Sequence, residues 1–360
     1  MEIGIIGLPR SGKTTLFNSL TRGKAETRAF AASGVEPNVG VVKVPDGRLE
    51  GLQALLKPKR LVAAEVKYVD VAISCDKKEG LGGPARSHLT KTDALIGVAR
   101  AFTDEAVPSS GGVDPWRDIG GISADLVLAD LAIAEHRLQR IGESLKGARS
   151  PERENLVKEQ AFVERIRASL ESGVPVRDQG LSGDEVRMAE GYQFLSSKPL
   201  LIVLNIGENQ LPQAPAIEDE ARKRYSRFNA AAICAKLEME LGQLTDAEAA
   251  EFRSAMGVSE GAMQRIIRLS YELVGMISFF SIASGEVRAW TVRRDTPAPK
   301  AAGRIHSDME RGFIRAEVVA YSDLVKCGSL AEAKKHGLLR LEGKNYLVQD
   351  GDVVTFLFSV

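Results

Sequence analysis

Apolar residues recur along the first two thirds of the chain in two alternating patterns. Short runs that are almost wholly apolar occur at 2–7 (EIGIIG), 63–72 (AAEVKYVDVA), near residue 98 and at 198–205 (KPLLIVLN). Such runs are typical of buried strands. The segment 15–20 (TLFNSL) instead has apolar residues at helical spacing. Strands that alternate with helices predict an α/β fold with a parallel sheet.

Two long amphipathic segments interrupt this pattern at 121–145 and 156–173. Their apolar positions are close to heptad spacing, and the polar stretch 146–155 separates them. Two helices with a short charged connection form an antiparallel coiled-coil arm, or alternatively a pair that packs flat on the domain. The apolar positions are Leu126, Leu131, Leu138, Ile141 and Leu145 in the first segment and Leu156, Phe162, Ile166 and Leu170 in the second.

From about Ile277 the pattern changes to short strand-like runs. These are 286–292, 313–321, 344–348 and 353–358, and the turn QDGD separates the last two. A helical segment opened by Pro299 and closed by Gly312 lies between the first two runs. Strand, helix, strand and a final hairpin predict a small β-grasp domain.

The segment 7–14 matches G-x-x-x-x-G-K-[ST], the phosphate-binding P-loop, between a predicted strand and a predicted helix. Glycines let consecutive backbone N–H groups turn toward a phosphate, and the helix N-terminus favours the anion. Lys13 is expected over the β- and γ-phosphates and is a candidate catalytic residue. The predicted nucleotide-binding residues here are Gly7, Leu8, Pro9, Arg10, Ser11, Gly12, Lys13, Thr14 and Thr15.

A P-loop also requires a Mg²⁺ site, and the sequence offers two residues for it. The hydroxyl of Thr14 is expected to ligate the ion. Asp70 ends an apolar strand, where a carboxylate holds the Mg²⁺ shell from the opposite side. An acidic residue at a strand end is also common without any such role. After Asp70 comes a glycine-containing loop, CDKKEGLGG, where a nucleotide switch would lie.

The residues predicted to read the base follow two later strands. Asn205, Ile206 and Glu208 occupy the place of N-K-x-D, in which the Asp carboxylate accepts hydrogen bonds from guanine. Ile206 and Glu208 replace the Lys and the Asp, so part of the reason to prefer guanine is lost. Cys234, Ala235 and Lys236 occupy the place of the loop that packs on the base.

Composition argues against several classes of partner and site. Basic and acidic residues balance at 48 each, which gives no overall electrostatic pointer to nucleic acid or membrane, and we expect no DNA partner. No apolar run approaches the roughly 20 residues of a membrane span. The three cysteines and four histidines are scattered, which argues against a zinc site or a disulfide framework and favours the cytoplasm.

With these motifs in place, the chain resembles the YchF or Obg-like ATPases over nearly its full length. These are Obg-related P-loop NTPases of the translation-factor class, and the resemblance rests on GLPRSGKTTLFN, EPNVGVVKVPDGRL, NIGE and the C-terminal block from 286 onward. It implies a preference for ATP with Mg²⁺, a coiled-coil arm, a C-terminal TGS domain associated with RNA, and a ribosome or ribosomal RNA partner. Residues that would meet RNA are Arg304, Arg311, Arg315 and Lys344; a solvated mixed surface is the alternative.

The chain also departs from the family pattern. Arg10 replaces the Asn that helps to hold K⁺ in potassium-stimulated relatives; it acts as a cis arginine finger and hence as a catalytic residue, or else points to solvent. The first-switch Thr is replaced by Gly34, next to Ser33. Asp70-Val71-Ala72 continues as Ile73-Ser74-Cys75, without the switch glycine. We therefore expect slow hydrolysis.

The sequence thus predicts a P-loop NTPase domain interrupted by an antiparallel coiled-coil arm and followed by a β-grasp TGS domain. The expected boundaries are 1–120 and 197–276 for the nucleotide domain, 121–196 for the arm and 277–360 for the TGS domain. The expected function is a Mg²⁺-dependent, ATP-binding regulatory switch with slow hydrolysis, associated with the ribosome. The alternatives are a GTP-binding GTPase of the Obg-related class and a nucleotide-sensing binding module with little turnover.

Overall fold

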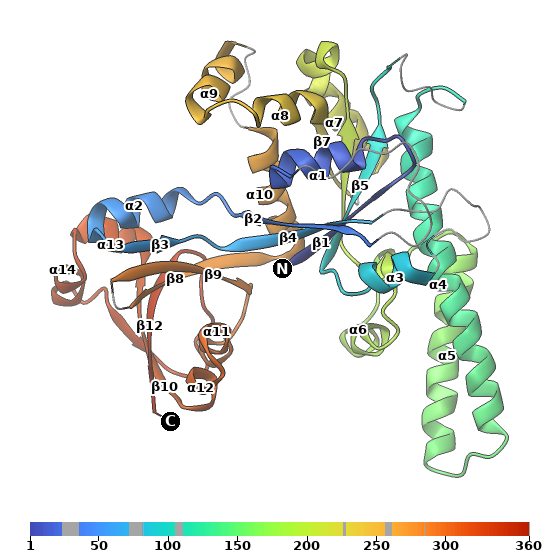
Figure 1. Ribbon diagram of the computed structural model, residues 1–360. Helices are drawn as coiled ribbons and strands as arrows, with labels where there is room; N and C mark the ends of the chain where they lie inside the picture. The colour runs from blue at the N-terminus through green and yellow to red at the C-terminus, as the bar shows by residue number, and fades with distance from the viewer. Residues whose placement is uncertain are drawn as a thin grey trace. The chain divides into compact units, whose positions relative to one another are not determined.

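A computed structural model describes residues 1–23, 36–71, 81, 83–104, 111–225, 228–255, 261–283 and 285–359 (Figure 1). The chain divides into two compact units, and each unit combines separate stretches of sequence. The larger unit comprises Glu2–Gly40 and Tyr68–Ser259. The smaller unit comprises Met1, Val41–Lys67 and Glu260–Val360.

A six-stranded sheet forms the centre of the larger unit. In spatial order its strands are β2 (Asn38–Lys43), β4 (Glu65–Asp70), β1 (Glu2–Gly7), β5 (Ala94–Arg100), β6 (Leu200–Asn205) and β7 (Asn229–Ile233). The pairs β1–β5, β5–β6 and β6–β7 are parallel, as the alternation of strands and helices predicts. Strands β5 and β6 are buried along their whole length, which explains their continuous apolar sequence. Because parallel strands end at one edge, the loops that follow β1, β5 and β6 meet there.

Helices pack on this sheet and extend from it. The α-helices are α1 (Lys13–Thr21), α3 (Gly83–Leu89), α4 (Pro115–Leu145), α5 (Glu152–Glu171), α6 (Gly183–Glu190), α7 (Ala214–Arg224), α8 (Ala235–Leu241) and α9 (Asp246–Ala255). The described part of the unit also has the short 3₁₀ helices η1 (Val176–Asp178), η2 (Leu195–Ser197) and η3 (Glu208–Gln213).

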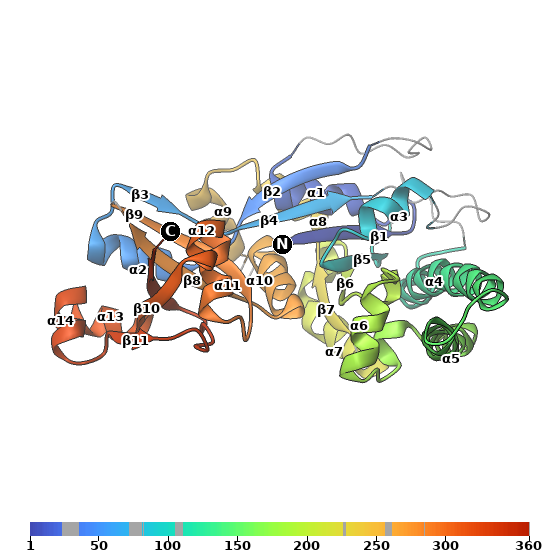
Figure 2. The ribbon, with the colours of Figure 1, turned by 90° about the horizontal axis from the view of Figure 1, so that it is seen from below.

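Helices α4 and α5 run side by side as an antiparallel hairpin (Figures 1 and 2). Asp114 caps the start of α4, because its carboxylate accepts hydrogen bonds from the backbone N–H groups of Trp116 and Arg117. The first half of α4, with Ile119, Ile122 and Leu126, packs in the core of the sheet. The second half packs against α5: Val127, Ala134 and Ile141 share a core with Phe162, Val163, Ile166 and Leu170. A single helix therefore connects the sheet with the hairpin.

The smaller unit contains a second six-stranded sheet, of mixed direction. In spatial order its strands are β11 (Arg340–Glu342), β10 (Phe313–Ala320), β12 (Asp352–Phe358), β8 (Met276–Ala283), β9 (Glu286–Arg293) and β3 (Arg60–Val62). Pairs β12–β8 and β3–β9 are parallel, and the other three pairs are antiparallel. Its helices are α2 (Gly47–Leu56), α10 (Ala262–Val274), α11 (Ala298–Ile305), α12 (Ser307–Arg311), α13 (Tyr321–Cys327) and α14 (Leu330–Lys335).

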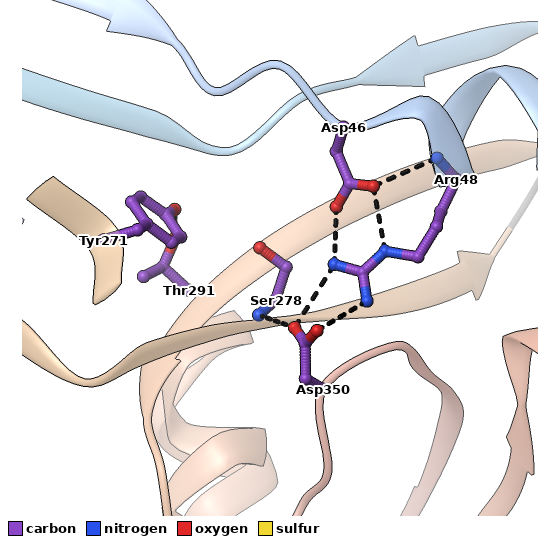
Figure 3. Close-up of polar contacts among 6 residues, drawn as sticks. All are labelled: Asp46, Arg48, Tyr271, Ser278, Thr291 and Asp350. Atoms are coloured by element: carbon purple, nitrogen blue, oxygen red, sulfur yellow. Dashed lines mark hydrogen bonds and ion pairs between the residues drawn. The ribbon is translucent and has the colours of Figure 1, made fainter. Parts of the chain in front are cut away.

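Arg48 joins the two sequence stretches of the smaller unit (Figure 3). Its guanidinium donates to both carboxylate oxygens of Asp46 and both of Asp350, at 2.8 to 3.2 Å. Asp350 Oδ1 also accepts a hydrogen bond of 2.9 Å from the backbone N–H of Ser278. Burial alone would lower the pKa of Arg48, but the hydrogen bonds and charges of the two carboxylates outweigh burial and raise it. The segment around α2 is therefore an integral part of this unit.

Two sequence predictions for the C-terminal region are wrong in detail. The segment 299–312 is not one helix, because the extended backbone of His306 (φ −159°, ψ 142°) separates α11 from α12. The predicted hairpin of 344–348 with 353–358 is also not formed, although the structure describes both segments. Leu347 pairs with Pro297 in an isolated bridge, and β12 lies between β10 and β8. Helices α13 and α14 were not predicted. Strand β12 therefore pairs with β10 and β8 and not with the segment 344–348 that precedes it.

Candidate nucleotide site

The P-loop connects β1 to α1, and its two motif glycines are sterically required. A β-carbon on Gly7 would lie 2.5 Å from the carbonyl oxygen of Val98. Gly12 has a positive φ of +91°, and a β-carbon there would lie 2.1 Å from Nδ2 of Asn205. Contacts under 3 Å leave no room for a side chain, so the loop can follow this path only with glycine at both places.

The positive side chain and the helix end of this loop are arranged for an anion. Lys13 Nζ donates hydrogen bonds to the carbonyl oxygens of Gly7 (2.8 Å) and Leu8 (3.0 Å), which holds the ammonium group over the loop. Helix α1 begins at Lys13 without a side-chain cap and without an acidic residue in its first turn. Its first N–H groups and its dipole therefore favour a bound phosphate.

Thr14 and Asp70 come together beside the P-loop from α1 and the end of β4. The Thr14 hydroxyl donates a hydrogen bond of 2.9 Å to Asp70 Oδ2, and Asp70 is only 5% exposed. A hydroxyl oxygen and a carboxylate are hard oxygen donors of the kind that Mg²⁺ takes together with phosphate oxygens and water. The described residues contain no cluster of three or more His, Cys, Asp or Glu at metal-binding distance. Mg²⁺ takes six oxygen ligands, so a two-residue site of this kind would leave the remaining positions to phosphate oxygens and water.

Asn205 links the P-loop to the segment that follows β7. Its Nδ2 donates to the carbonyl oxygen of Ser11 (3.0 Å), and its Oδ1 accepts from the backbone N–H of Ala235 (3.1 Å). Three of the predicted segments therefore meet at one side chain. The neighbouring Ile206 is 1% exposed and belongs to the core of the sheet, so its side chain is not part of an open surface.

The remaining base-reading candidates lie around this junction. The carboxylate of Glu208 is 3.9 Å from Lys236 Nζ, and both side chains are more than half exposed. Cys234 is 3% exposed, and burial raises the pKa of its thiol, so the sulfur is held as a neutral packing group. Thr15 is half-buried in the first turn of α1, and its carbonyl accepts from Ser19 Oγ.

Arg10 and Ser11, in the middle of the loop, each have an unusual feature. Arg10 is exposed and has a positive φ of +64°, a left-handed conformation that few non-glycine residues adopt. Ser11 is 1% exposed, and its hydroxyl oxygen has no hydrogen-bond partner among the described residues. Pro9, between Leu8 and Arg10, is exposed at the turn.

Two residues that the sequence analysis did not identify lie at the same site. Asn38, the first residue of β2, donates from Nδ2 to Asp70 Oδ2 at 3.3 Å. Phe102 lies two residues after the end of β5, and Cε1 of its ring is 3.9 Å from the position of a β-carbon on Gly12. The guanidinium of Arg100 stacks over that ring at 4.4 Å. Two signals could have identified them: Phe102 follows a buried parallel strand, and Asn38 belongs to EPNVGVVKVPDGRL, a segment that carries the family resemblance.

Some predicted positions lie outside the part of the chain that the structure describes. They are Ser33 and Gly34 of the first switch and Ile73, Ser74 and Cys75 after Asp70, together with most of the glycine loop that follows. The RNA candidates Arg304, Arg311, Arg315 and Lys344 are described and exposed in the smaller unit, and Arg311 forms an ion pair with Asp308. Within the described residues, no helix is both long and apolar enough to cross a membrane.

Two family patterns match the chain in separate regions. Residues 2–107 match the family described as 50S ribosome-binding GTPase. Residues 276–359 match the C-terminal family of YchF GTPases, described as a protein of unknown function. The first match covers the P-loop, Asp70 and Phe102, and the second covers most of the smaller unit.

Full-length relatives agree with these matches. The chain is 39% identical to the ribosome-binding ATPases YchF of Bacillus subtilis and Haemophilus influenzae and 36% identical to that of Escherichia coli O157:H7. Each match covers 100% of this chain and at least 99% of the relative. The solved structure of the Schizosaccharomyces pombe YchF GTPase is 29% identical, with a TM-score of 0.87 over 99% of this chain and 97% of that one. The chain is therefore a member of the YchF family.

Proposed function

We propose that the chain is a Mg²⁺-dependent, ATP-binding regulatory switch that hydrolyses ATP slowly and associates with the ribosome. The observation that carries the proposal is the convergence of Lys13, Thr14 and Asp70 at the start of α1. A cation from Lys13 and a shielded Thr–Asp pair are the groups that a nucleoside triphosphate with its Mg²⁺ requires. The ribosome association follows the names of the bacterial relatives.

ATP is proposed as the nucleotide because the guanine-reading pair is missing. The position of the Lys in N-K-x-D is the buried Ile206, and the position of the Asp is the longer Glu208. The bacterial relatives are named ATPases. GTP remains the second candidate, since the S. pombe relative is named a GTPase. Competitive titration of one labelled nucleotide with ATP and with GTP decides between them, and a tenfold preference for GTP would overturn the choice of ATP.

Bound Mg²⁺ would neutralise charge on the transferred phosphoryl group, with Thr14 and Asp70 as its protein-side residues. The chain's own groups position the phosphates: the P-loop N–H groups and Lys13 hold them, and Asn205 fixes the loop against α8. Residues 73–75 carry no Gln that could orient water. We therefore expect an intrinsic rate of ~10⁻⁴ to 10⁻² s⁻¹, as for unassisted switch NTPases. Phosphate release at several per second from the purified protein would contradict this.

The finer architecture belongs to the same proposal. We assign the α4–α5 hairpin as a coiled-coil arm within 121–196, between the nucleotide-domain parts 1–120 and 197–276, and residues 277–360 as a β-grasp TGS domain. The strand order β9-β8-β12-β10-β11, with β8 and β12 parallel in the middle, supports the β-grasp assignment. The shared packing of α4 supports an arm continuous with the sheet.

The test of the nucleotide site is Lys13→Ala. The substitution removes the ammonium group that would donate to the phosphates. The affinity for the triphosphate should therefore fall roughly a hundredfold, which corresponds to about 2.7 kcal/mol. Lys13 is only partly buried and its two bonds are to carbonyls of its own loop, so circular dichroism and thermal unfolding should change little. Lys146→Ala, an exposed lysine on the hairpin connection, is the matched control. Unaltered ATP affinity in Lys13→Ala would place the phosphates elsewhere.

A further inference from the structure

Asp70 Oδ2 is the meeting point of two hydrogen bonds from two different elements. Thr14 Oγ1 donates to it from α1 at 2.9 Å, and Asn38 Nδ2 donates to it from β2 at 3.3 Å. The Thr14 hydroxyl has one proton, and it donates that proton to Asp70. The lone pairs of its oxygen therefore point away from Asp70 and can accept from or ligate another partner. The orientation of the Asp70 carboxylate therefore determines where the Thr14 oxygen can bind a cation.

The backbone of β2 fixes the place from which Asn38 donates. Strands β2 and β4 are neighbours in the sheet, and Asp70 ends β4. Two residues beyond Asn38, on the same face of β2, a β-carbon on Gly40 would lie 2.3 Å from Cγ2 of Thr21. Thr14 and Thr21 are seven residues apart, which puts them on one face of α1. The strand thus lies closely along that face of α1, with Gly40 against Thr21 and Asn38 at the level of Thr14 and Asp70.

The sequence gives a second reason to assign a role to the Asn38 amide. The position at which relatives of the family carry the first-switch Thr is Gly34, and a glycine has no side-chain oxygen to offer a cation wherever it lies. Asn38 follows it by four residues, on the strand that leaves the same segment. It is therefore a polar side chain from the first-switch side of the chain that does reach the Mg²⁺ residues.

We propose that Asn38 is a positioning residue for the Mg²⁺ of the bound nucleotide, acting through Asp70. Its amide holds the Asp70 carboxylate in the orientation that receives the Thr14 proton, and this leaves the Thr14 oxygen directed at the ion. The inference rests on the proposed Mg²⁺–ATP binding. It adds a specific role for a residue that touches neither the metal nor the nucleotide in this arrangement.

The test is the Mg²⁺ dependence of nucleotide binding, measured without turnover. The affinity for a fluorescent, non-hydrolysable ATP analogue is determined at increasing Mg²⁺ and in EDTA, for wild type, Asn38→Ala and Asn38→Gln. In Asn38→Ala the Mg²⁺ concentration for half-maximal tightening should rise about tenfold, which corresponds to about 1.4 kcal/mol. The affinity in EDTA should not change. Asn38→Gln keeps an amide donor and should recover part of the loss.

Val39→Ala is the matched control, since Val39 is the next residue of β2, half exposed, and projects from the opposite face. Its Mg²⁺ dependence should equal that of the wild type. An unchanged Mg²⁺ dependence in Asn38→Ala, or an equal loss of affinity with and without Mg²⁺, would overturn the positioning role. If the wild type bound the analogue in neither condition, the proposed function itself would fail, and this outcome is distinct from the other two.

Discussion

At the scale of single residues, Arg10 combines a left-handed backbone conformation with an exposed side chain in the P-loop. Its φ of +64° costs an ordinary residue free energy, whereas Asn tolerates the left-handed region well. The side chain is exposed at the turn of the P-loop, close to where phosphates would bind. The conformation is thus compatible with both hypotheses, an arginine finger and a solvent-facing side chain, and kinetics has to separate them.

If Arg10 supplies N–H donors to the phosphates in the transition state, Arg10→Ala should lower turnover at least tenfold with less than a threefold change in ATP affinity. The wild type should turn over equally in Na⁺ and K⁺, because a guanidinium cannot ligate a cation. Asn tolerates this backbone conformation and is the residue that potassium-stimulated relatives carry here, so Arg10→Asn should gain K⁺ stimulation. Single-turnover phosphate release in both salts measures these effects. An unchanged rate in Arg10→Ala would leave Arg10 as a surface residue.

At the scale of elements, the base of the α4–α5 hairpin depends on a buried carboxylate. Asp130 of α4 has no exposed surface and accepts hydrogen bonds from the backbone N–H groups of Leu195 (2.8 Å) and Ser196 (2.7 Å). Arg86 of α3 lies 3.7 Å from it and also donates to the carbonyl oxygen of Gln193. Burial raises the pKa of Asp130, but these contacts oppose that effect. One side chain thus joins α3, α4 and the segment that returns to β6.

Asp130→Ala should therefore destabilise the larger unit by about 2–4 kcal/mol, because two buried N–H groups lose their acceptor. Chemical denaturation measures this change. Asp184→Ala is the control: its ion pair with Arg187 is on the surface, and its loss should cost less than about 0.5 kcal/mol. A cost for Asp130→Ala no larger than the control would mean that water or a local rearrangement replaces the carboxylate.

The elements also show what sequence patterns can and cannot predict. The P-loop, the strands that end at Asp70 and Asn205, and both long helices were predictable because each depends on a local motif or period. Strand β3 has three residues and pairs with β9 more than two hundred positions later, so no local pattern reveals it. The contact of Asn38 with Asp70 and the position of β12 between β10 and β8 likewise depend on long-range packing.

At the scale of the whole molecule, deletion of the C-terminal residues 277–360 would not remove the whole smaller unit. Residues 41–67 belong to it: β3 pairs with β9, and Arg48 of α2 bonds Asp350. Deleting 277–360 would expose Leu49 and Leu52, which are buried on α2, and would leave Arg48 without Asp350. A ribosome co-sedimentation experiment that compares nucleotide states is therefore better made with the full chain and point variants. Charge reversal of Arg304 and Arg315 tests the RNA candidates in that setting.

The integrity of the smaller unit can be followed separately, because the chain has two tryptophans and one lies in each unit. Trp290 is in β9 of the smaller unit, and Trp116 is in α4 of the larger. In a Trp116→Phe background, Arg48→Ala should lower the denaturant concentration at the midpoint of the Trp290 fluorescence transition. The free energy of unfolding of the smaller unit should fall by about 1–2 kcal/mol. The reason is that two carboxylates lose their shared, partly buried partner, and a cation stacked over Phe280 at 5.3 Å is also lost.

Arg60→Ala is the control for this variant. Arg60 also joins the two stretches, through Glu286 at 3.4 Å, but its side chain is 69% exposed and water screens the pair. Its midpoint should match that of the parent. If Arg48→Ala left the Trp290 transition in place, α2 would be held by apolar packing alone. The segment that leaves the first switch would then be joined to the C-terminal sheet without the charged link that Asp46, Arg48 and Asp350 form.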